Sequence, residues 1–152
     1  MTELLPILLL VEDDPADARL IIRALEKVEI PARVVHLKDG DDAVAYLTRE
    51  SPHASEAQVA VPQLVIMDLK LPRRSGLEVL QWIRKQESEI SRVPVIMLSS
   101  SHHSVDIERA YRYGVNSYLV KPETSDQLLS MMTVLKTYWF YNNKTPLLPA
   151  VC

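Results

Sequence analysis

Cysteine is almost absent from this sequence: the only one is Cys152, the last of 152 residues. A disulfide within the chain and a metal site built from several cysteines are therefore excluded. This cysteine usage fits a reducing compartment, and we expect a cytoplasmic protein.

Long apolar runs are missing as well. The first run, PILLLV at residues 6–11, has only six residues, whereas a membrane-spanning helix needs about 20. The N-terminal stretch also lacks the basic region and the small-residue cleavage site of a signal peptide. We therefore expect no membrane partner for this chain.

Neither an excess of basic charge nor an abundance of glycine is present. The chain has 17 Lys and Arg against 20 Asp and Glu, with a net charge of −3. Nucleic-acid binding usually requires a basic face, so no nucleic-acid partner is expected. With only three glycines, the chain has no glycine-rich loop to cradle phosphate, which argues against a flavodoxin-like cofactor carrier.

Short apolar runs alternate with amphipathic segments along the whole chain. The runs predict strands at residues 7–11, 32–37, 63–68, 94–99 and 117–120. The amphipathic segments predict helices at residues 15–29, 40–50, 76–86, 104–114 and 125–140. Such alternation indicates an α/β fold, in which a doubly wound, five-stranded parallel sheet has five helices on its two faces. We expect one domain over residues 1–141, a surface loop at 50–62 and a tail at 142–152.

Polar residues stand where four of the predicted strands end. Glu12 and Asp13 follow the first strand, and Asp68 ends the third. The fourth strand ends at Ser99, and the fifth leads into Lys121. Because the carboxyl ends of parallel strands meet at one edge of the sheet, these side chains are expected to converge there.

The expected cluster has the chemistry of a metal-assisted phosphoryl acceptor. Carboxylates about 5 Å apart repel one another by roughly 3 kcal/mol per pair at an effective dielectric constant near 20, and a cation relieves that repulsion. Hard oxygen ligands without His or Cys suit Mg²⁺. Beside such an ion Asp68 is a plausible nucleophile toward phosphorus, while Ser99 and Lys121 would bind phosphoryl oxygens.

Other residues near these strand ends have simpler interpretations. Asp14 precedes Pro15 and fits a helix N-cap, although its closeness to the acidic pair leaves a metal role open. Asp17 is predicted to favour the positive end of the first helix, a structural role. Ser99 could be an ordinary loop serine, and Tyr118 an ordinary core aromatic.

The motifs in their order resemble the response-regulator receiver domain, the CheY-like phosphoacceptor module of two-component signalling. The segments that carry the resemblance are LLVEDDPADA, LVIMDLKLPRRSGLEVL, PVIMLSSS and GVNSYLVKP, and the resemblance spans residues 6–140. It implies a flavodoxin-like sheet with strand order 2-1-3-4-5. It also implies a non-enzymatic signalling protein, with only self-catalysed phosphoryl uptake and slow autodephosphorylation.

The resemblance assigns a role to each matching position. Asp68 matches the phosphoacceptor, and Lys121 matches the lysine of the site, whose bond to Pro122 is usually cis in the family. Ser99 and Tyr118 match the switch residues. The residues that match the Mg²⁺ ligands are Glu12, Asp13, Asp68 and the backbone carbonyl of Lys70.

A narrower likeness concerns the partners. VEDDPAD, the long loop and the aromatic-rich last helix with its Leu-Pro tail resemble regulators that partner phytochrome-type histidine kinases. The last helix also carries apolar residues beyond those that would cover the sheet: Leu129, Val134, Tyr138, Phe140 and Tyr141. This excess predicts a protein partner surface. The resemblance to the receiver family, which often dimerises through the face made by the fourth helix, fifth strand and fifth helix, implies a homodimer through that face.

Three other functions are alternatives for this sequence. A phosphohydrolase of the haloacid dehalogenase type also uses an Asp nucleophile with Mg²⁺, but needs D-x-D after the first strand. Here the candidate nucleophile follows the third strand, in the sequence DLK. The two remaining alternatives are a receiver fold that serves only as a scaffold and a receiver that serves as an intermediate in a phosphorelay.

Overall fold

A computed structural model describes residues 5–48 and 61–146 of the chain. Most of the predicted loop at 50–62 and the end of the predicted tail, including Cys152, lie outside these residues. Within the described ranges, no helix is both long and apolar enough to cross a membrane.

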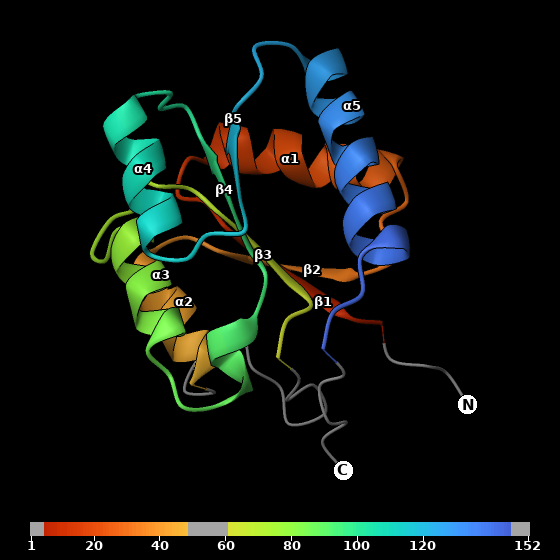
Figure 1. The fold of residues 1–152 in the computed structure, drawn as a ribbon. Coiled ribbons are helices and arrows are strands. Elements are labelled where there is room, and N and C mark those ends of the chain that lie inside the picture. Colours follow the sequence, from red (N-terminus) through yellow and green to blue (C-terminus); the bar gives the residue numbers. More distant parts are fainter. Residues whose placement is uncertain (1–4, 49–60, 147–152) are drawn as a thin grey trace.

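A five-stranded parallel sheet forms the centre of the molecule (Figure 1). Its strands run in the order β2-β1-β3-β4-β5, which confirms the predicted topology. The bounds of the strands are β1 Ile7–Val11, β2 Arg33–Leu37, β3 Leu64–Met67, β4 Val95–Ser99 and β5 Ser117–Val120. All neighbouring pairs are parallel, so the carboxyl ends of the strands lie together at one edge.

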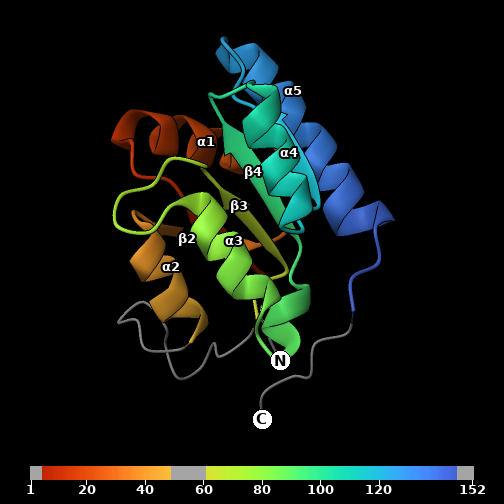
Figure 2. The same ribbon diagram turned by 60° about the vertical axis from the view of Figure 1, so that its left-hand side comes forward.

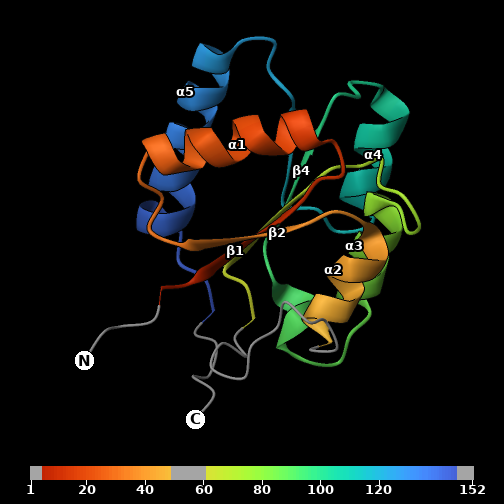
Figure 3. The ribbon, with the colours of Figure 1, turned by 180° about the vertical axis from the view of Figure 1, so that it is seen from behind.

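Five α-helices in the described residues connect these strands. They are α1 Pro15–Lys27, α2 Gly40–Leu47, α3 Gly76–Arg84, α4 Ser104–Arg112 and α5 Ser125–Lys136. Two irregular helical turns accompany them, the 3₁₀ turn η2 Glu89–Arg92 and the π-helical turn η3 Thr137–Asn142. The helices α1 and α5 pack together on one face of the sheet (Figure 3), and α2, α3 and α4 lie side by side on the other (Figure 2).

Alternation along β1 explains why the sheet is covered on both faces. Leu9 and Val11 belong to the hydrophobic cluster under α2, α3 and α4. Leu8 and Leu10 belong to a second cluster under α1 and α5. Successive side chains of a strand point to opposite faces, so a continuous apolar run is stable only between two helical layers.

The termini of the helices next to the sheet edge are fixed by local hydrogen bonds. Asp14 caps α1, because its Oδ1 accepts from the backbone N–H groups of Ala16 at 2.8 Å and Asp17 at 3.0 Å. Thr124 and Gln127 form a capping box at the start of α5. Gly76 begins α3 so close to Asp68 that a Cβ there would lie 2.2 Å from the Asp68 carbonyl oxygen, which explains the glycine.

Half-buried Arg84, the last residue of α3, joins this helix to the segments that lead into β4 and β5. Its Nε donates to the carbonyl of Gly114 at 2.9 Å, and its Nη1 to those of Ser91 at 3.0 Å and Val93 at 2.7 Å. Its Nη2 donates to Asn116 Oδ1 at 2.8 Å. A guanidinium group presents five donors in a fixed plane, which suits one side chain to several carbonyls.

Replacing Arg84 by Met is expected to lower the free energy of unfolding by about 2–4 kcal/mol, because it leaves several carbonyls without donors. Chemical denaturation at fixed pH measures the change. Arg112 is the matched control, since its ion pair with Glu108 on α4 is exposed, and R112M should cost about 0–1 kcal/mol. Equal losses in the two variants would contradict this account of Arg84.

Candidate functional site

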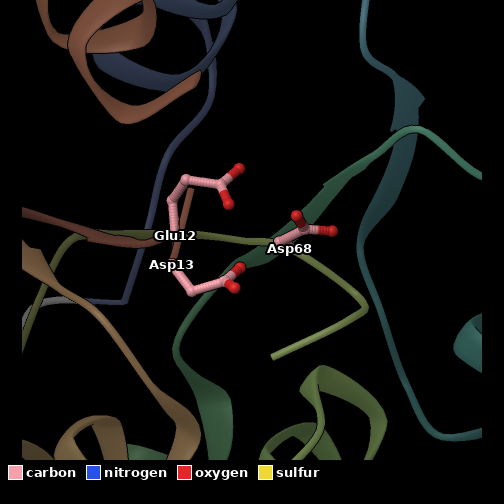
Figure 4. Close-up of side chains that lie close together, drawn as sticks. All are labelled: Glu12, Asp13 and Asp68. Carbon is pink, nitrogen blue, oxygen red and sulfur yellow. The ribbon is translucent and has the colours of Figure 1, made fainter. Parts of the chain in front are cut away.

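Three carboxylates meet at the carboxyl edge of the sheet, as predicted. Glu12 and Asp13 follow β1, Asp68 follows β3, and each offers an oxygen that lies within 4.8 Å of the other two (Figure 4). Glu12 is 1% exposed and Asp68 9% exposed, whereas Asp13 is exposed to solvent. We call this group of three carboxylates, two buried and one exposed, the acidic pocket.

Lys121, which follows β5, places its ammonium group inside the acidic pocket. Its Nζ lies 2.6 Å from Glu12 Oε1 and 2.9 Å from Asp68 Oδ2. A third carboxylate, that of Asp17 on α1, has its Oδ2 at 2.8 Å. The backbone N–H of Lys121 donates to the Ser99 carbonyl at 2.8 Å, which holds the lysine beside the end of β4.

Burial and charge in the pocket shift the pKa values of Glu12 and Lys121. Burial raises the pKa of Glu12 to about 7; the hydrogen bond from Lys121 opposes this shift, and the charge of Asp68 adds to it. Burial lowers the pKa of Lys121, but hydrogen bonds to Asp17, Glu12 and Asp68 leave it above its ordinary value. The lysine is therefore held as a cation, and a further positive charge would also favour the ionised form of Glu12.

The backbone around Asp68 fixes the direction of its side chain. Its N–H donates to the Val11 carbonyl at 3.0 Å, which ties the end of β3 to β1. The N–H of Lys70 donates to Asp68 Oδ1 at 3.3 Å, while Oδ2 accepts from Lys121. The two carboxylate oxygens of Asp68 thus have different partners. The role of the Lys70 carbonyl as a metal ligand stays a prediction.

Ser99 and Tyr118 both contact the loop after β4 through Ser101. Ser99 is buried, and its Oγ accepts from the Ser101 N–H at 3.2 Å. The Tyr118 hydroxyl donates to the Ser101 carbonyl at 2.8 Å. The Ser101 hydroxyl in turn donates to Asp106 Oδ2, in the first turn of α4, at 2.5 Å. A movement of the Ser99 hydroxyl therefore has a path of hydrogen bonds to α4 and to Tyr118.

One expectation near the site is wrong, and another is incomplete. The peptide bond between Lys121 and Pro122 is trans, so the cis bond implied by the resemblance is wrong for this structure; most X–Pro bonds are trans. Asp17 was assigned only a helix-stabilising role, yet its carboxylate pairs with Lys121. The sequence position could have indicated this contact, because Asp17 lies in the first turn of the helix that follows β1 and therefore at the same edge of the sheet.

Asp14 keeps the role that its sequence context favours. It supplies the two cap hydrogen bonds of α1, and the cluster of mutually close carboxylates forms without it. His102 and His103 are exposed and stack on each other, with ring centroids 5.6 Å apart. Neither histidine belongs to a metal-binding cluster within the described residues.

Comparison with known proteins agrees with this geometry. The family profile described as "Response regulator receiver domain" matches residues 8–133. The probable methanogenesis regulatory protein FilR2 of Methanothrix harundinacea is 39% identical over 140 residues, which cover 92% of this chain and 87% of FilR2. Response regulator Rcp1 of Synechocystis is 35% identical over 144 residues, covering 95% and 93% of the two chains.

Solved structures give the same result. The phosphorylated cyanobacterial phytochrome response regulator RcpA superposes with a TM-score of 0.83 at 35% identity, over 93% of this chain and 99% of RcpA. The Mn²⁺-bound form of Rcp1 superposes with a TM-score of 0.81 at 32% identity, over the same shares of the two chains. This chain is thus related in sequence and in structure to phytochrome response regulators, and it belongs to the response regulator receiver domain family.

Proposed function

We propose that Asp68 accepts a phosphoryl group from a histidine kinase and that the resulting aspartyl phosphate is the signal that this chain transmits. The observation that carries the proposal is the acidic pocket, in which Asp68 lies beside two further carboxylates and 2.9 Å from the ammonium of Lys121. Phosphoryl transfer needs mainly positioning and neutralisation of charge. A cation bound among the three carboxylates would relieve their mutual repulsion, and Lys121 would pair with the phosphoryl group once it is attached to Asp68. The pocket therefore meets both needs.

The donor set of the pocket fits Mg²⁺. Oxygens of Glu12, Asp13 and Asp68 lie close enough together to share one ion, and a hard divalent cation prefers such ligands. The Lys70 carbonyl is proposed as a fourth ligand. When bound, Mg²⁺ would neutralise charge on the carboxylates and on the phosphoryl oxygens. The Mn²⁺ in the structure of Rcp1, a relative, is consistent with a divalent-ion site of this kind.

The roles of the remaining site residues follow from their contacts. Lys121 would pair with a phosphoryl oxygen, since its ammonium already contacts Asp68 Oδ2. Ser99 would donate its hydroxyl to another oxygen, which would weaken its bond from the Ser101 N–H. Tyr118 donates its hydroxyl to the carbonyl of the same Ser101, so a shift of Ser101 would also move or break the hydrogen bond of Tyr118. This is the switch that we propose between the acidic pocket and the face made by α4, β5 and α5.

A signalling role is favoured over an enzymatic one. Receiver domains are signalling proteins, and we propose that this chain performs only phosphoryl uptake and slow autodephosphorylation. The phosphohydrolase alternative is weak because the candidate nucleophile follows β3 rather than the first strand. The scaffold alternative is weak because Asp68, Asp13 and Lys121 are all present. Service as a phosphorelay intermediate would use the same site.

The kinase is proposed to be of the phytochrome type. RcpA, a phytochrome response regulator, matches this chain over nearly its whole length. FilR2 matches it equally well in sequence but is named for methanogenesis, so the partner needs a direct test. Phosphotransfer from a phytochrome-type kinase should be much faster than transfer from an unrelated histidine kinase. Equal rates would contradict the assignment of the partner.

The chemical part of the proposal is tested with a small phosphodonor. Acetyl phosphate with Mg²⁺ should add about 80 Da, the mass of one phosphoryl group, to the intact chain. Excess EDTA should prevent the addition, because the carboxylates would keep their charge and repel the donor. Equal uptake in EDTA would exclude the proposed metal dependence, and absence of uptake under both conditions would exclude the function.

We also propose that the chain forms a homodimer through the face made by α4, β5 and α5. Large apolar side chains are exposed on the elements of this face and on η3: Val105, Tyr111, Val120, Val134, Tyr138 and Tyr141. A groove of about 730 Å³ between β5 and the last helix adds a concave apolar surface, walled in part by Leu119 and Trp139. Apolar surface of this kind on a receiver domain favours a protein partner.

Light scattering at micromolar concentration should give twice the 17.3 kDa mass of one chain, with or without beryllium fluoride as a phosphoryl mimic. Val134 is 66% exposed on α5, and V134D should return the chain to a monomer because a charge would be buried in the interface. Leu20, 45% exposed on α1, offers the control L20D, which should stay dimeric. A monomeric wild type in both states would exclude the dimer.

The division of the chain into a receiver domain at 1–141 and a tail at 142–152 is likewise a proposal. The proposed boundary lies one residue before the end of η3, whose last residue is Asn142. The cytoplasmic location and the absence of a nucleic-acid partner stay predictions from composition and charge.

A further inference from the structure

The carboxylate of Asp17 stands where α1 meets the acidic pocket, and three features fix it there. Asp17 lies in the first turn of α1, and its backbone N–H is held by the Asp14 cap at 3.0 Å. Its Oδ2 accepts a hydrogen bond from Lys121 Nζ at 2.8 Å. The side chain is 38% exposed, whereas that of Lys121 is only 14% exposed, so Asp17 lies at the rim and the lysine inside.

The three carboxylates around Lys121 are not equivalent. An ammonium group has three N–H donors, and here Glu12, Asp68 and Asp17 are its three acidic partners. Glu12 and Asp68 also belong to the cluster whose oxygens fit a divalent cation, but Asp17 does not. Of the three carboxylates that contact Lys121, Asp17 is therefore the only one that the proposed metal site does not use.

We propose that Asp17 is a positioning residue that holds the ammonium of Lys121 over Asp68, so that the lysine is in place when a phosphoryl group arrives. This inference rests on the proposed function. Without Asp17, the lysine would depend on the two carboxylates that the metal also needs. Its long side chain would then sample other rotamers, and a smaller share of molecules would present the ammonium at Asp68.

A purely structural role for Asp17 is the competing explanation. An acidic residue in the first turn of a helix stabilises the helix through its dipole, whatever lies nearby. Asp126 provides the comparison, because it occupies the first turn of α5, is exposed and makes no ion pair within the described residues. A helix effect alone would make D17N and D126N behave alike.

The experiment compares D17N, D126N and the conservative variant D17E with the wild type. In the metal-free protein, the ammonium protons of Lys121 are followed by NMR, and their exchange with solvent should be about three- to tenfold faster in D17N only. The initial rate of phosphorylation by acetyl phosphate with Mg²⁺ should fall in D17N by about three- to tenfold, the range expected for one partly exposed charge-assisted hydrogen bond. D17E should recover most of both effects, because a carboxylate is restored.

The outcomes separate this inference from the function on which it rests. Normal phosphorylation of the wild type, together with the same rate and the same exchange in D17N as in D126N, would overturn the role of Asp17 and leave the function standing. If the wild type takes up no phosphoryl group, the proposed function fails and this role fails with it. Faster exchange in D17N with an unchanged rate would show that Asp17 binds the lysine without aiding the transfer, which also overturns the proposal.

Discussion

Replacing Asp68 by Asn is expected to abolish phosphorylation of the chain by acetyl phosphate. The carboxamide is a poor nucleophile and cannot form the acyl phosphate, whereas its size and shape are nearly those of the carboxylate. The fold should persist, because the variant removes one of three mutually repelling carboxylates and leaves Lys121 paired with Glu12 and Asp17. Intact mass spectrometry after incubation with Mg²⁺ should show no added mass of about 80 Da.

The matched control is D126N, which makes the same chemical change at an exposed aspartate on α5. It should be phosphorylated like the wild type. Undiminished uptake by D68N would mean that another group accepts the phosphoryl, with exposed Asp13 in the same pocket as the first candidate. That result would overturn the assignment of the site.

Replacing Lys121 by Met is expected to reduce phosphorylation at least about 100-fold and to lower the free energy of unfolding by about 2–4 kcal/mol without a metal. The ammonium contacts three carboxylates, one of which, Glu12, is 1% exposed. Without the lysine, these carboxylates face one another with no positive charge between them. Mg²⁺ should therefore restore more stability to K121M than it adds to the wild type, while the phosphorylation defect should remain.

Thermal and chemical denaturation with EDTA and with Mg²⁺ would measure this difference. Lys136 is the matched control. It is the last residue of α5, and its Nζ donates to the Val28 carbonyl at 2.6 Å rather than to a carboxylate of the acidic pocket. K136M should lose stability equally in EDTA and in Mg²⁺, and it should be phosphorylated normally. A K121M variant whose stability is independent of Mg²⁺ would contradict the account of charge balance in the pocket.

The architecture of this chain could be predicted from its sequence because the alternation of apolar runs is unusually regular. Buried strands such as Ile7–Val11 leave little ambiguity when amphipathic segments separate them. Element ends were less accurate: α1 ends at Lys27 rather than at 29, and α5 at Lys136 rather than at 140. Helix C-termini depend on tertiary contacts and on irregular turns such as η3, which periodicity does not record.

The site was predictable to the extent that it depends on strand ends. Parallel strands bring their carboxyl ends together whatever their side chains are, so the meeting of Glu12, Asp13 and Asp68 followed from topology. The pair between Asp17 and Lys121 joins residues 104 positions apart through a helix and a loop. Its existence depends on where the start of α1 lies relative to the residue that follows β5, which no local pattern encodes.

The contacts of Arg84 and Ser101 were missed for a related reason. Arg84 fits the helical register of α3, but its hydrogen bonds go to carbonyls of residues outside the helix, such as Val93 and Gly114. Ser101 is one of three consecutive serines, and only the folded loop singles it out as the residue that contacts both Ser99 and Tyr118. Polar networks of this kind are specified by tertiary geometry rather than by residue type.

The most direct test of the central claim is to locate the phosphoryl group itself. The chain is incubated with acetyl phosphate and Mg²⁺, the acyl phosphate is reduced with borohydride, and the peptides are sequenced by mass spectrometry. The account predicts that the reduced residue, homoserine, replaces aspartate at Asp68 alone, in the peptide that follows β3. Reduction at Asp13, at Asp17 or at any other carboxylate, with Asp68 intact, would contradict it.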